Sequence, residues 1–466
     1  MSSEFVFQDA VELSRKLQSR EVSARETLEA HLEQIERVNP SVNAVCTLVA
    51  EQAMDTAKKL DNGPVTGPLH GIPIGIKDLS PTKGIRTTFG SPIYADWVPD
   101  FDALPVTRIK NAGAVIIGKT NTPEFGAGSQ TFNPVFGTTL NPYDTSKTCG
   151  GSSGGSAVAL ACGMVPLATG SDLGGSLRNP AAWCNVVGIR TSVGRVPSYP
   201  TTLGYNSLSV QGPMGRTVDD VALQLSMLAG PDNRIPNCLP EPGKTFASPL
   251  ERSMKGVRVA WSPDLGYPVD ARIKSTLEKQ RKVFEDLGCI VEEATPDLSD
   301  ADEIFHVFRA YKFASDYKKH LETQPEKLKD TVIWNVREGL KLSAMDVADA
   351  EVKRTRLHER MAAFFSKYEF LLCPVTSVPP FSIEQEYVTE INGVKLDNYI
   401  KWMATCYAIT VTGNPAISVP AGFTDSGLPV GLQIVGGYRK DFGVLQMGKA
   451  FETATQFARK RPNVAG

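Results

Sequence analysis

The sequence lacks the segments that would attach it to a membrane or carry it through one. No apolar run approaches the roughly 18 residues that a membrane-spanning helix needs. The N-terminal stretch MSSEFVFQDAVELSRKLQSRE carries charges throughout, in place of the basic region and apolar run of a secretory signal. We therefore expect no membrane association and a cytoplasmic location.

An excess of charge of either sign is also missing. The chain has 49 Lys and Arg residues against 51 Asp and Glu residues, so it offers no basic field for a phosphate backbone. Its eight cysteines are scattered without a CxxC pair, and no two of its five histidines have metal-ligand spacing. These absences predict no nucleic-acid partner, no disulfide framework and no metal site.

What is present is enough apolar sequence for a large core. The 466 residues are 41% hydrophobic, which suffices for one large domain. Ser23 and Glu26 have capping-box spacing ahead of an amphipathic pattern, which predicts a helix that Asn39-Pro40 should end. Residues 1–60 are thus expected to form a mainly helical N-terminal region that packs on the core, formed by residues 61–466.

Short apolar runs bounded by glycine and proline follow this region. They predict strands, with a helix over 156–162 between two of them, at 72–76, 114–117, 165–168 and 186–189. The alternation continues with a strand in 256–261, a helix over 271–287 and a strand in 289–294. Strands alternating with helices, without a low-complexity linker, predict a single α/β domain.

The C-terminal part is predicted less clearly. A polar helical region extends to about residue 367, and strand-like runs at 370–375, 409–420 and 428–436 then lead to a last helix. Four large apolar residues recur at helical spacing, and we expect them to lie in the core, with a wall of the substrate pocket as the alternative. They are Tyr399, Trp402, Met403 and Tyr407.

Three short motifs compete for a functional interpretation. Residues 113–120, GAVIIGKT, match the phosphate-loop pattern, but the intervening residues are typical of a strand and no helix start follows, so we expect neither a nucleotide nor another cofactor. Residues 151–155 match GxSxG, with Ser153 as nucleophile, but the preceding residues are rich in turn formers instead of forming a strand. Residues 170–178, GSDLGGSLR, would let backbone N–H groups approach a substrate oxygen, although a plain glycine turn is equally consistent.

Three segments together carry a resemblance to a known family. GIKD at 75–78, GGSSGGS at 150–156 and GSDLGGSLR at 170–178, in that order, resemble the amidase signature family. The resemblance extends to NAGAVIIGKTNTPEF, GPMGRTVDD and GLPVGLQIVG, and is weakest at about 240–370. It implies a mixed β-sheet covered by helices on both faces, and an enzyme that hydrolyses the carbon–nitrogen bond of a small-molecule amide.

The family's site residues transfer to matching positions of this sequence. The resemblance makes Lys77 the catalytic base, Ser152 a bridging serine on a cis peptide bond and Ser176 the nucleophile. It also implies an oxyanion hole from the backbone N–H groups of Leu173, Gly174, Gly175 and Ser176, and a pocket lined by Gly126, Ala127 and Gly128. Two departures are minor, since Ser171 stands where threonine is common and Asn185 where glycine is usual.

The proposed chemistry needs a neutral lysine. Burial of Lys77 would lower its pKa, and Ser152 could then relay a proton from Ser176 because a hydroxyl both donates and accepts. From the residues alone an exposed strand-end lysine is the better interpretation of Lys77, and Asp78 beside it would favour the charged form.

Four further residues are expected to support this site. Asp172 and Arg178 are expected to form an ion pair that braces the oxyanion loop. Ser153 and Ser171 are expected to act as hydrogen-bond partners behind the reacting groups.

The resemblance leaves the reaction partner and the assembly open. The alternative function is a glutamine-hydrolysing subunit of a transfer-RNA-dependent amidotransferase, although TSVGRVPSYP resembles stand-alone amidases more closely. Family members often form homodimers, which makes a homodimer an alternative to a monomer. We expect substrate selection to lie in the less distinctive region at about 240–410, and the sequence does not choose the amide.

Overall fold

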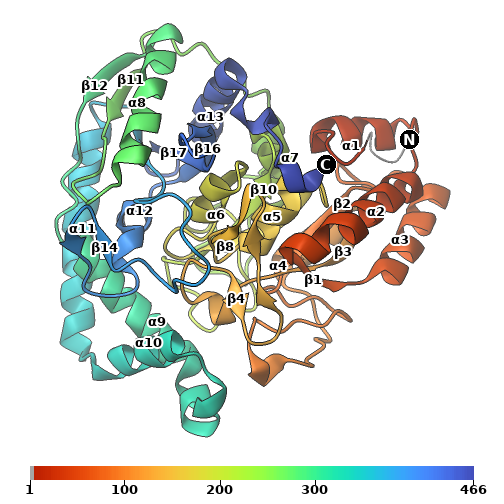
Figure 1. Cartoon of the computed structure of the whole chain (residues 1–466), viewed down its shortest axis with the longest axis horizontal. Coiled ribbons are helices and arrows are strands. Elements are labelled where there is room, and N and C mark those ends of the chain that lie inside the picture. Colours follow the sequence, from red (N-terminus) through yellow and green to blue (C-terminus); the bar gives the residue numbers. More distant parts are fainter. Residues whose placement is uncertain (1–4) are drawn as a thin grey trace.

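The computed structural model describes residues 5–466 and shows an α/β domain built on one eleven-stranded sheet (Figure 1). The strand order is β1-β3-β2-β8-β10-β9-β16-β17-β13-β11-β12. The strands span Val45–Leu48 (β1), Pro73–Lys77 (β2), Val115–Thr120 (β3), Leu167–Asp172 (β8), Val187–Arg190 (β9), Val210–Gly215 (β10), Arg258–Trp261 (β11), Ile290–Glu293 (β12), Phe370–Pro374 (β13), Ala416–Phe423 (β16) and Pro429–Gly436 (β17).

The sheet is mixed. Parallel pairs lie near its two ends, where β2 joins β3 and β8, and β11 joins β12 and β13. The strands between β8 and β13 pair antiparallel. Three two-stranded hairpins lie outside the sheet and pair Phe132–Asn133 (β4) with Gly137–Thr138 (β5), Leu140–Asn141 (β6) with Asp144–Thr148 (β7), and Glu390–Ile391 (β14) with Val394–Lys395 (β15).

Helices cover both faces of the sheet, as β17 shows. Successive side chains of a strand point to opposite faces, so Gly431 and Gly436 face opposite ways. A Cβ at Gly431 would meet Ala182 of α6, whereas a Cβ at Gly436 would meet Val444 of α13. The helices span Ala10–Gln18 (α1), Ala24–Val42 (α2), Ala50–Asn62 (α3), Leu104–Asn111 (α4), Gly154–Ala161 (α5), Arg178–Trp183 (α6), Val218–Leu228 (α7), Ala271–Asp286 (α8), Ala301–Thr323 (α9), Asp330–Lys341 (α10), Ala344–Phe365 (α11), Ala404–Thr412 (α12) and Asp441–Thr455 (α13). The predicted α/β fold with a mixed, two-sided sheet is confirmed.

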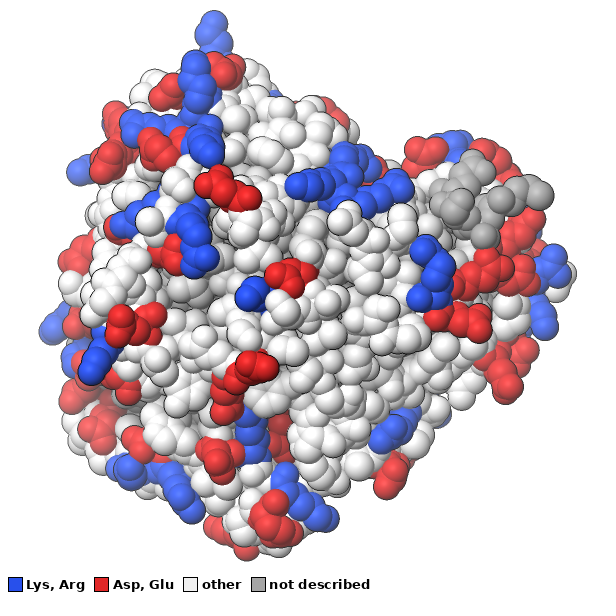
Figure 2. All heavy atoms as spheres, viewed as in Figure 1, with Lys and Arg blue, Asp and Glu red and all other residues white. Residues whose placement is uncertain are grey.

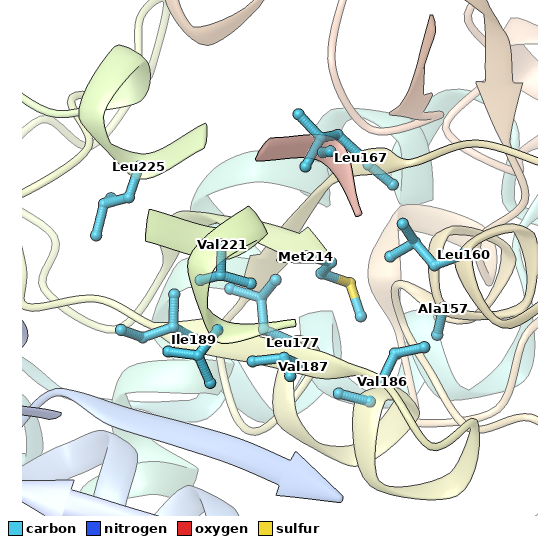
Figure 3. Close-up of a cluster of buried hydrophobic side chains, with 14 of the residues drawn as sticks. Ala157, Leu160, Leu167, Leu177, Val186, Val187, Ile189, Met214, Val221 and Leu225 are labelled. Carbon is cyan, nitrogen blue, oxygen red and sulfur yellow. The ribbon is translucent and has the colours of Figure 1, made fainter. Parts of the chain in front are cut away.

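The core reaches directly behind the predicted nucleophile loop. Leu177, which follows Ser176, is fully buried beside Met214, Val187 and Ile189 (Figure 3). Its side chain lies so close to the backbone of β8 and β10 that a Cβ at Gly170 or Gly212 would meet it within 3 Å. Burying one leucine stabilises a fold by about 1.5–3 kcal/mol. The core therefore anchors the loop that carries Ser176.

The N-terminal helices α1 to α3 lie at the right of Figure 1, in red, beside the two marked ends of the chain. The capping box of Ser23 and Glu26 is present at the start of α2. The prediction that Asn39-Pro40 ends this helix is wrong, because α2 continues to Val42. Proline removes only one hydrogen bond in a last turn, and Asn43 closes the helix in the left-handed conformation (φ 51°).

A second correction concerns the strand-like run at 409–420. Residues 409–412 form the end of helix α12, and only residues from Ala416 onward form strand β16. The β-branched residues of ITVT lie on a helix whose residues are all buried, so their strand propensity does not decide the structure. Gly413 ends the helix at φ 77°.

Within residues 5–466, no helix is long and apolar enough to cross a membrane. Positive and negative side chains are interspersed over the face shown in Figure 2.

Candidate active site

Lys77 is the last residue of β2 and lies beside the end of β8. The two strands are parallel neighbours, so their carboxyl ends meet at one edge of the sheet. The Lys77 backbone N–H donates to Thr169 Oγ1 at 2.9 Å, which fixes the strand end. Only 1% of Lys77 is exposed, so it is not the exposed strand-end lysine that the residues alone favour.

Three serine hydroxyls surround the Lys77 amine. Nζ lies 2.8 Å from Ser152 Oγ, 2.8 Å from Ser153 Oγ and 3.0 Å from Ser171 Oγ. Burial lowers the pKa of Lys77 to about 7, and the charge of Asp172 offsets only part of this shift. A neutral amine has two N–H donors and one lone pair, so one of the three hydroxyls can donate to it. Lys77 can therefore act as a base near neutral pH.

Asp78 does not oppose this shift. Its carboxylate accepts hydrogen bonds from the backbone N–H and the hydroxyl of Thr88, and it lies 3.9 Å from Nζ of Lys119. The adjacent carboxylate thus serves a different lysine.

Ser152 and Ser153 lie on a loop between β7 and α5. The peptide bond between Gly151 and Ser152 is cis, as the resemblance implies. The hydroxyl of Ser129 donates to the Gly151 carbonyl at 2.6 Å. Gly155 lets the following helix approach closely, because a Cβ there would lie 2.3 Å from the Asn121 nitrogen.

The surroundings of Ser153 differ from those of a GxSxG nucleophile. A short strand, β7, does precede the motif, although the sequence suggested only turns there, but it belongs to a separate hairpin. Ser153 is fully buried and contacts Lys77, and no histidine is hydrogen-bonded to it within the described chain. A serine–histidine arrangement is thus not built at Ser153.

Asp172 holds the Ser176 loop in place. Its carboxylate accepts hydrogen bonds from the backbone N–H groups of Gly175 at 2.9 Å and Leu177 at 3.2 Å. Arg178 and Arg190 lie 3.0 and 3.1 Å from it, which is the bracing ion pair expected from the sequence with a second arginine added. Burial alone would raise the pKa of Asp172, but the two guanidinium groups hold it well below its usual range.

The hydrogen bonds to Asp172 occupy one of the backbone N–H groups that were expected to form the oxyanion hole. The Gly175 N–H points at Asp172 and is not free for a substrate oxygen. Across residues 5–466, the backbone N–H groups of Leu173, Gly174 and Ser176 form no hydrogen bond with the protein. Gly175 still shapes the turn, since its φ is 128° and a Cβ there would lie 2.7 Å from Cys406.

Residues of GGSSGGS and GSDLGGSLR line a cavity of about 200 Å³. Ser152, Ser171 and Ser176 all line it, together with Leu173 and Gly174. Ser176 is half-buried, and its hydroxyl makes no hydrogen bond to Ser152 in the described chain. Lys77 lies behind the serines instead of in the wall.

The expected pocket glycines lie at the same cavity. Gly126 and Gly128 line it, whereas Ala127 is buried behind them. Glu124 holds this turn by accepting hydrogen bonds from the Ser91 hydroxyl at 2.6 Å and the Lys329 backbone N–H at 2.7 Å. Burial raises the pKa of Glu124.

The rest of the wall was missed by sequence reasoning. The missed residues are Leu79, Phe89, Phe125, Ser209, Gln211, Phe305, Arg309, Lys312, Phe313, Asp316 and Tyr317. Several of them lie four residues apart on α9, which the sequence showed only as part of a polar helical region. An i, i+4 stripe of aromatic residues on that helix was the signal that could have indicated a wall.

The other sequence candidates lie elsewhere. Lys119 and Thr120 of GAVIIGKT belong to strand β3, so no phosphate loop forms there. Within residues 5–466, no group of three or more His, Cys, Asp or Glu side chains could hold a metal ion. Of the four large apolar residues near 400, Met403 lines the cavity, and Trp402 stacks on Trp183 with ring centroids 5.4 Å apart.

Comparisons with known proteins agree with this geometry. A family model described as Amidase matches residues 26–445. The Acylamidase of Rhodococcus erythropolis is 36% identical over 461 residues, which cover 97% of this chain and 96% of that protein. A Glutamyl-tRNA(Gln) amidotransferase subunit of Desulfatibacillum aliphaticivorans is 34% identical over 479 residues, covering 96% and 97% respectively.

A solved structure agrees as well. The crystal structure of a bacterial aryl acylamidase of the amidase signature family superposes with a TM-score of 0.91 at 28% identity, covering 97% of this chain and 98% of that one. The family match spans most of the chain, and both relatives exceed 30% identity over nearly its whole length. The chain belongs to the amidase signature family, as its three motifs predicted.

Proposed function

We propose that this chain is a stand-alone amidase that hydrolyses the carbon–nitrogen bond of a small amide through an acyl-enzyme on Ser176. The observation that carries the proposal is the Lys77 amine, buried, with a pKa of about 7, and in contact with three hydroxyls. Two of those hydroxyls, on Ser152 and Ser171, line the cavity that Ser176 also lines.

The reaction is proposed to run in two halves. Ser176 Oγ attacks the amide carbon while its proton passes through Ser152 to Lys77, and the free N–H groups of Leu173, Gly174 and Ser176 stabilise the oxyanion. The carbon–nitrogen bond breaks as the same proton returns through Ser152 to the leaving nitrogen, which departs as an amine or ammonia. Water then attacks the Ser176 ester with Lys77 as base, which releases the carboxylic acid.

A second candidate is a glutamine-hydrolysing subunit of a transfer-RNA-dependent amidotransferase. It is favoured by one observation, the 34% identity to a Glutamyl-tRNA(Gln) amidotransferase subunit over almost the whole chain. The 36% identity to an Acylamidase and the TM-score of 0.91 with an aryl acylamidase support the stand-alone function.

The deciding experiment compares purified wild-type protein with its Ser176→Ala variant on five compounds. These are an aliphatic amide, benzamide, an anilide, a dipeptide amide and glutamine. We expect turnover of at least one amide other than glutamine, and its loss in Ser176→Ala with an unchanged thermal unfolding midpoint.

Two results would overturn the proposal. Ammonia from glutamine alone, or turnover only after a partner protein is added, would put the amidotransferase function first. Full activity of folded Ser176→Ala would remove Ser176 as the nucleophile for either function.

A further inference from the structure

Arg309 is a buried cation in the wall of the active-site cavity. It lies in the middle of α9, only 5% of it is exposed, and it lines the same cavity as Ser176. Buried charges in proteins are normally paired with an opposite charge, so its partners are informative.

Every partner of the Arg309 guanidinium is neutral. Nε donates to Asn335 Oδ1 at 3.0 Å and Nη2 donates to the Tyr399 hydroxyl at 2.8 Å. The guanidinium carbon also lies 4.6 Å from the centroid of the Phe313 ring. Among residues 5–466, no carboxylate lies within 4.0 Å of Arg309, and its Nη1 donates to no protein acceptor.

The other charged groups of the wall do not neutralise it. Lys312 and Asp316 pair with each other at 2.6 Å, and Asp316 also accepts a hydrogen bond from the Thr202 hydroxyl. Burial lowers the pKa of His306, which lies one turn before Arg309 on α9, and this favours the neutral form of the imidazole. The wall thus retains one positive charge without a counter-ion.

This charge lies close to the reacting centre. Phe305 packs on the Ser176 loop so tightly that a Cβ at Gly174 would lie 2.6 Å from its ring. Arg309 is four residues further along the same helix and lies on the same face, about 6 Å along the axis. A group bound at Arg309 would therefore be only a few bonds from a carbonyl held at the loop.

We propose that Arg309 binds a carboxylate of the substrate, so that the preferred amides are those with a carboxylate a few bonds from the scissile carbonyl. The guanidinium is held by Asn335 and Tyr399 with one nitrogen free, and a carboxylate would supply the missing opposite charge. This inference rests on the proposed amidase function and adds the class of its substrate.

The first test uses wild-type protein and two matched pairs of anilides. The first pair is N-(4-nitrophenyl)succinamate and 4-nitrobutyranilide, which differ by a carboxylate in place of a methyl group on the acyl side. The second pair, 4-acetamidobenzoate and 4-acetamidotoluene, makes the same exchange on the amine side. We expect about 10- to 100-fold higher kcat/KM for the carboxylate member of one pair, the usual effect of a hydrogen bond to a charged group.

The second test removes the charge. Arg309→Gln should erase the preference, so that the ratio of kcat/KM between the carboxylate and the neutral member falls to about one, mainly through a higher KM for the carboxylate member. Arg309→Lys should retain part of the preference, because lysine keeps the positive charge but lacks the planar guanidinium that can donate two hydrogen bonds to one carboxylate. Lys319→Gln, which removes an exposed charge from the same helix, is the matched control and should retain the whole preference.

The outcomes separate this inference from the amidase proposal. Equal rates within both pairs for wild-type protein would overturn the carboxylate site and leave the amidase function standing. If no amide is hydrolysed, calorimetric binding of the same four compounds to Ser176→Ala decides, because tighter binding of a carboxylate member that Arg309→Gln removes would support the site alone. Equal binding there would overturn it.

Discussion

Two buried lysines lie side by side in this sheet, and they differ in what surrounds them. Lys77 ends β2 and Lys119 lies near the end of β3, on parallel strands in which Ile76 pairs with Lys119 and Lys77 with Thr120. Both side chains are fully buried, and burial lowers the pKa of both, to about 7 for Lys77 and about 8 for Lys119. A lowered lysine pKa therefore does not identify the base by itself.

The difference lies in their hydrogen-bond partners. Lys119 Nζ donates to the Ser80 carbonyl and to the Thr82 and Thr87 hydroxyls, with Asp78 at 3.9 Å, and none of these residues lines the cavity. Lys77 contacts three serine hydroxyls, and two of them line it. A buried lysine becomes useful as a base when hydroxyls connect it to the substrate space.

The largest expected effect separates the two lysines by activity. Lys77→Met should lower kcat about 10³- to 10⁴-fold, because it removes the proposed base for the Ser176 proton. Lys119→Met should keep kcat per folded molecule within about tenfold. Amide turnover should be measured on both variants after circular dichroism confirms that they are folded. Equal losses in the two folded variants would erase the distinction.

The next effect is the pH dependence of turnover. Lys77 must be neutral to act, so kcat/KM should rise about fivefold from pH 6 to pH 7, reach about ten times its pH 6 value by pH 8 and level off above that, given its pKa of about 7. Lys119→Met should retain this profile. Lys77→Arg, which stays charged, should remain inactive at every pH. A flat wild-type profile between pH 6 and 9 would contradict Lys77 as the base.

Stability should respond to pH in a way that sharpens the comparison. The folded pKa of Lys77 lies below its unfolded value of 10.5, so the folded state binds fewer protons between about pH 7 and 10.5. The free energy of unfolding of wild type therefore rises with pH through this window. Below pH 7 the folded state carries the whole penalty for burying a protonated Lys77. Lys77→Met removes this penalty. The unfolding midpoint of the variant minus that of wild type should therefore be several degrees higher at pH 7 than at pH 10.

Lys119 provides the control for this measurement. Its window is narrower, from about pH 8 to 10.5, and its removal leaves the buried Asp78 without a cation. Lys119→Met should therefore have a free energy of unfolding about 3 kcal/mol lower than that of wild type at pH 7, and it should unfold at a lower temperature. A more stable Lys119→Met protein, or a difference in unfolding midpoint between Lys77→Met and wild type that is the same at pH 7 and pH 10, would contradict the assigned roles.

The smallest expected effect concerns one partner of Lys77. Ser171→Ala removes the 3.0 Å contact but leaves Ser152 and Ser153 in place, so kcat should fall about threefold to tenfold. Thr82→Ala, the matching change at Lys119, should leave kcat unchanged. Kinetics of both variants at saturating substrate would test this, and a loss above 10³-fold for Ser171→Ala would make Ser171 part of the proton path.

The sequence predicted the strands that carry the site because their signals are local. The apolar run predicted at 72–76 forms β2 with a shift of one residue, and the run predicted at 165–168 marks the start of β8, which continues to Asp172. Burial of Lys77 was not predictable from the residues alone, since a charged strand end is usually exposed and the covering serines come from distant segments. Only the resemblance indicated it.

The far wall of the cavity could not be predicted for a different reason. Arg309 and Phe305 reach the cavity because α9 packs across the Ser176 loop, and the aromatic stripe of α9 indicates a buried face without indicating which segment covers it. The end of α12 was misassigned because tertiary burial overrides the strand propensity of ITVT. Asn185, where relatives usually carry glycine, has a φ of 56°, which explains that preference and why asparagine suits the position.

Because the Lys77 amine is buried behind serine hydroxyls, it can accept a proton without being accessible as a nucleophile. A lysine that is neutral near pH 7 is the form that reacts with acylating reagents, so its pKa alone would make it the first amine to be labelled. Its amine is instead closed off behind serine hydroxyls, so such reagents reach only the exposed lysines. If the proposed acyl-enzyme forms on Ser176, the reactive amine of Lys77 can lie near the acyl group without receiving it.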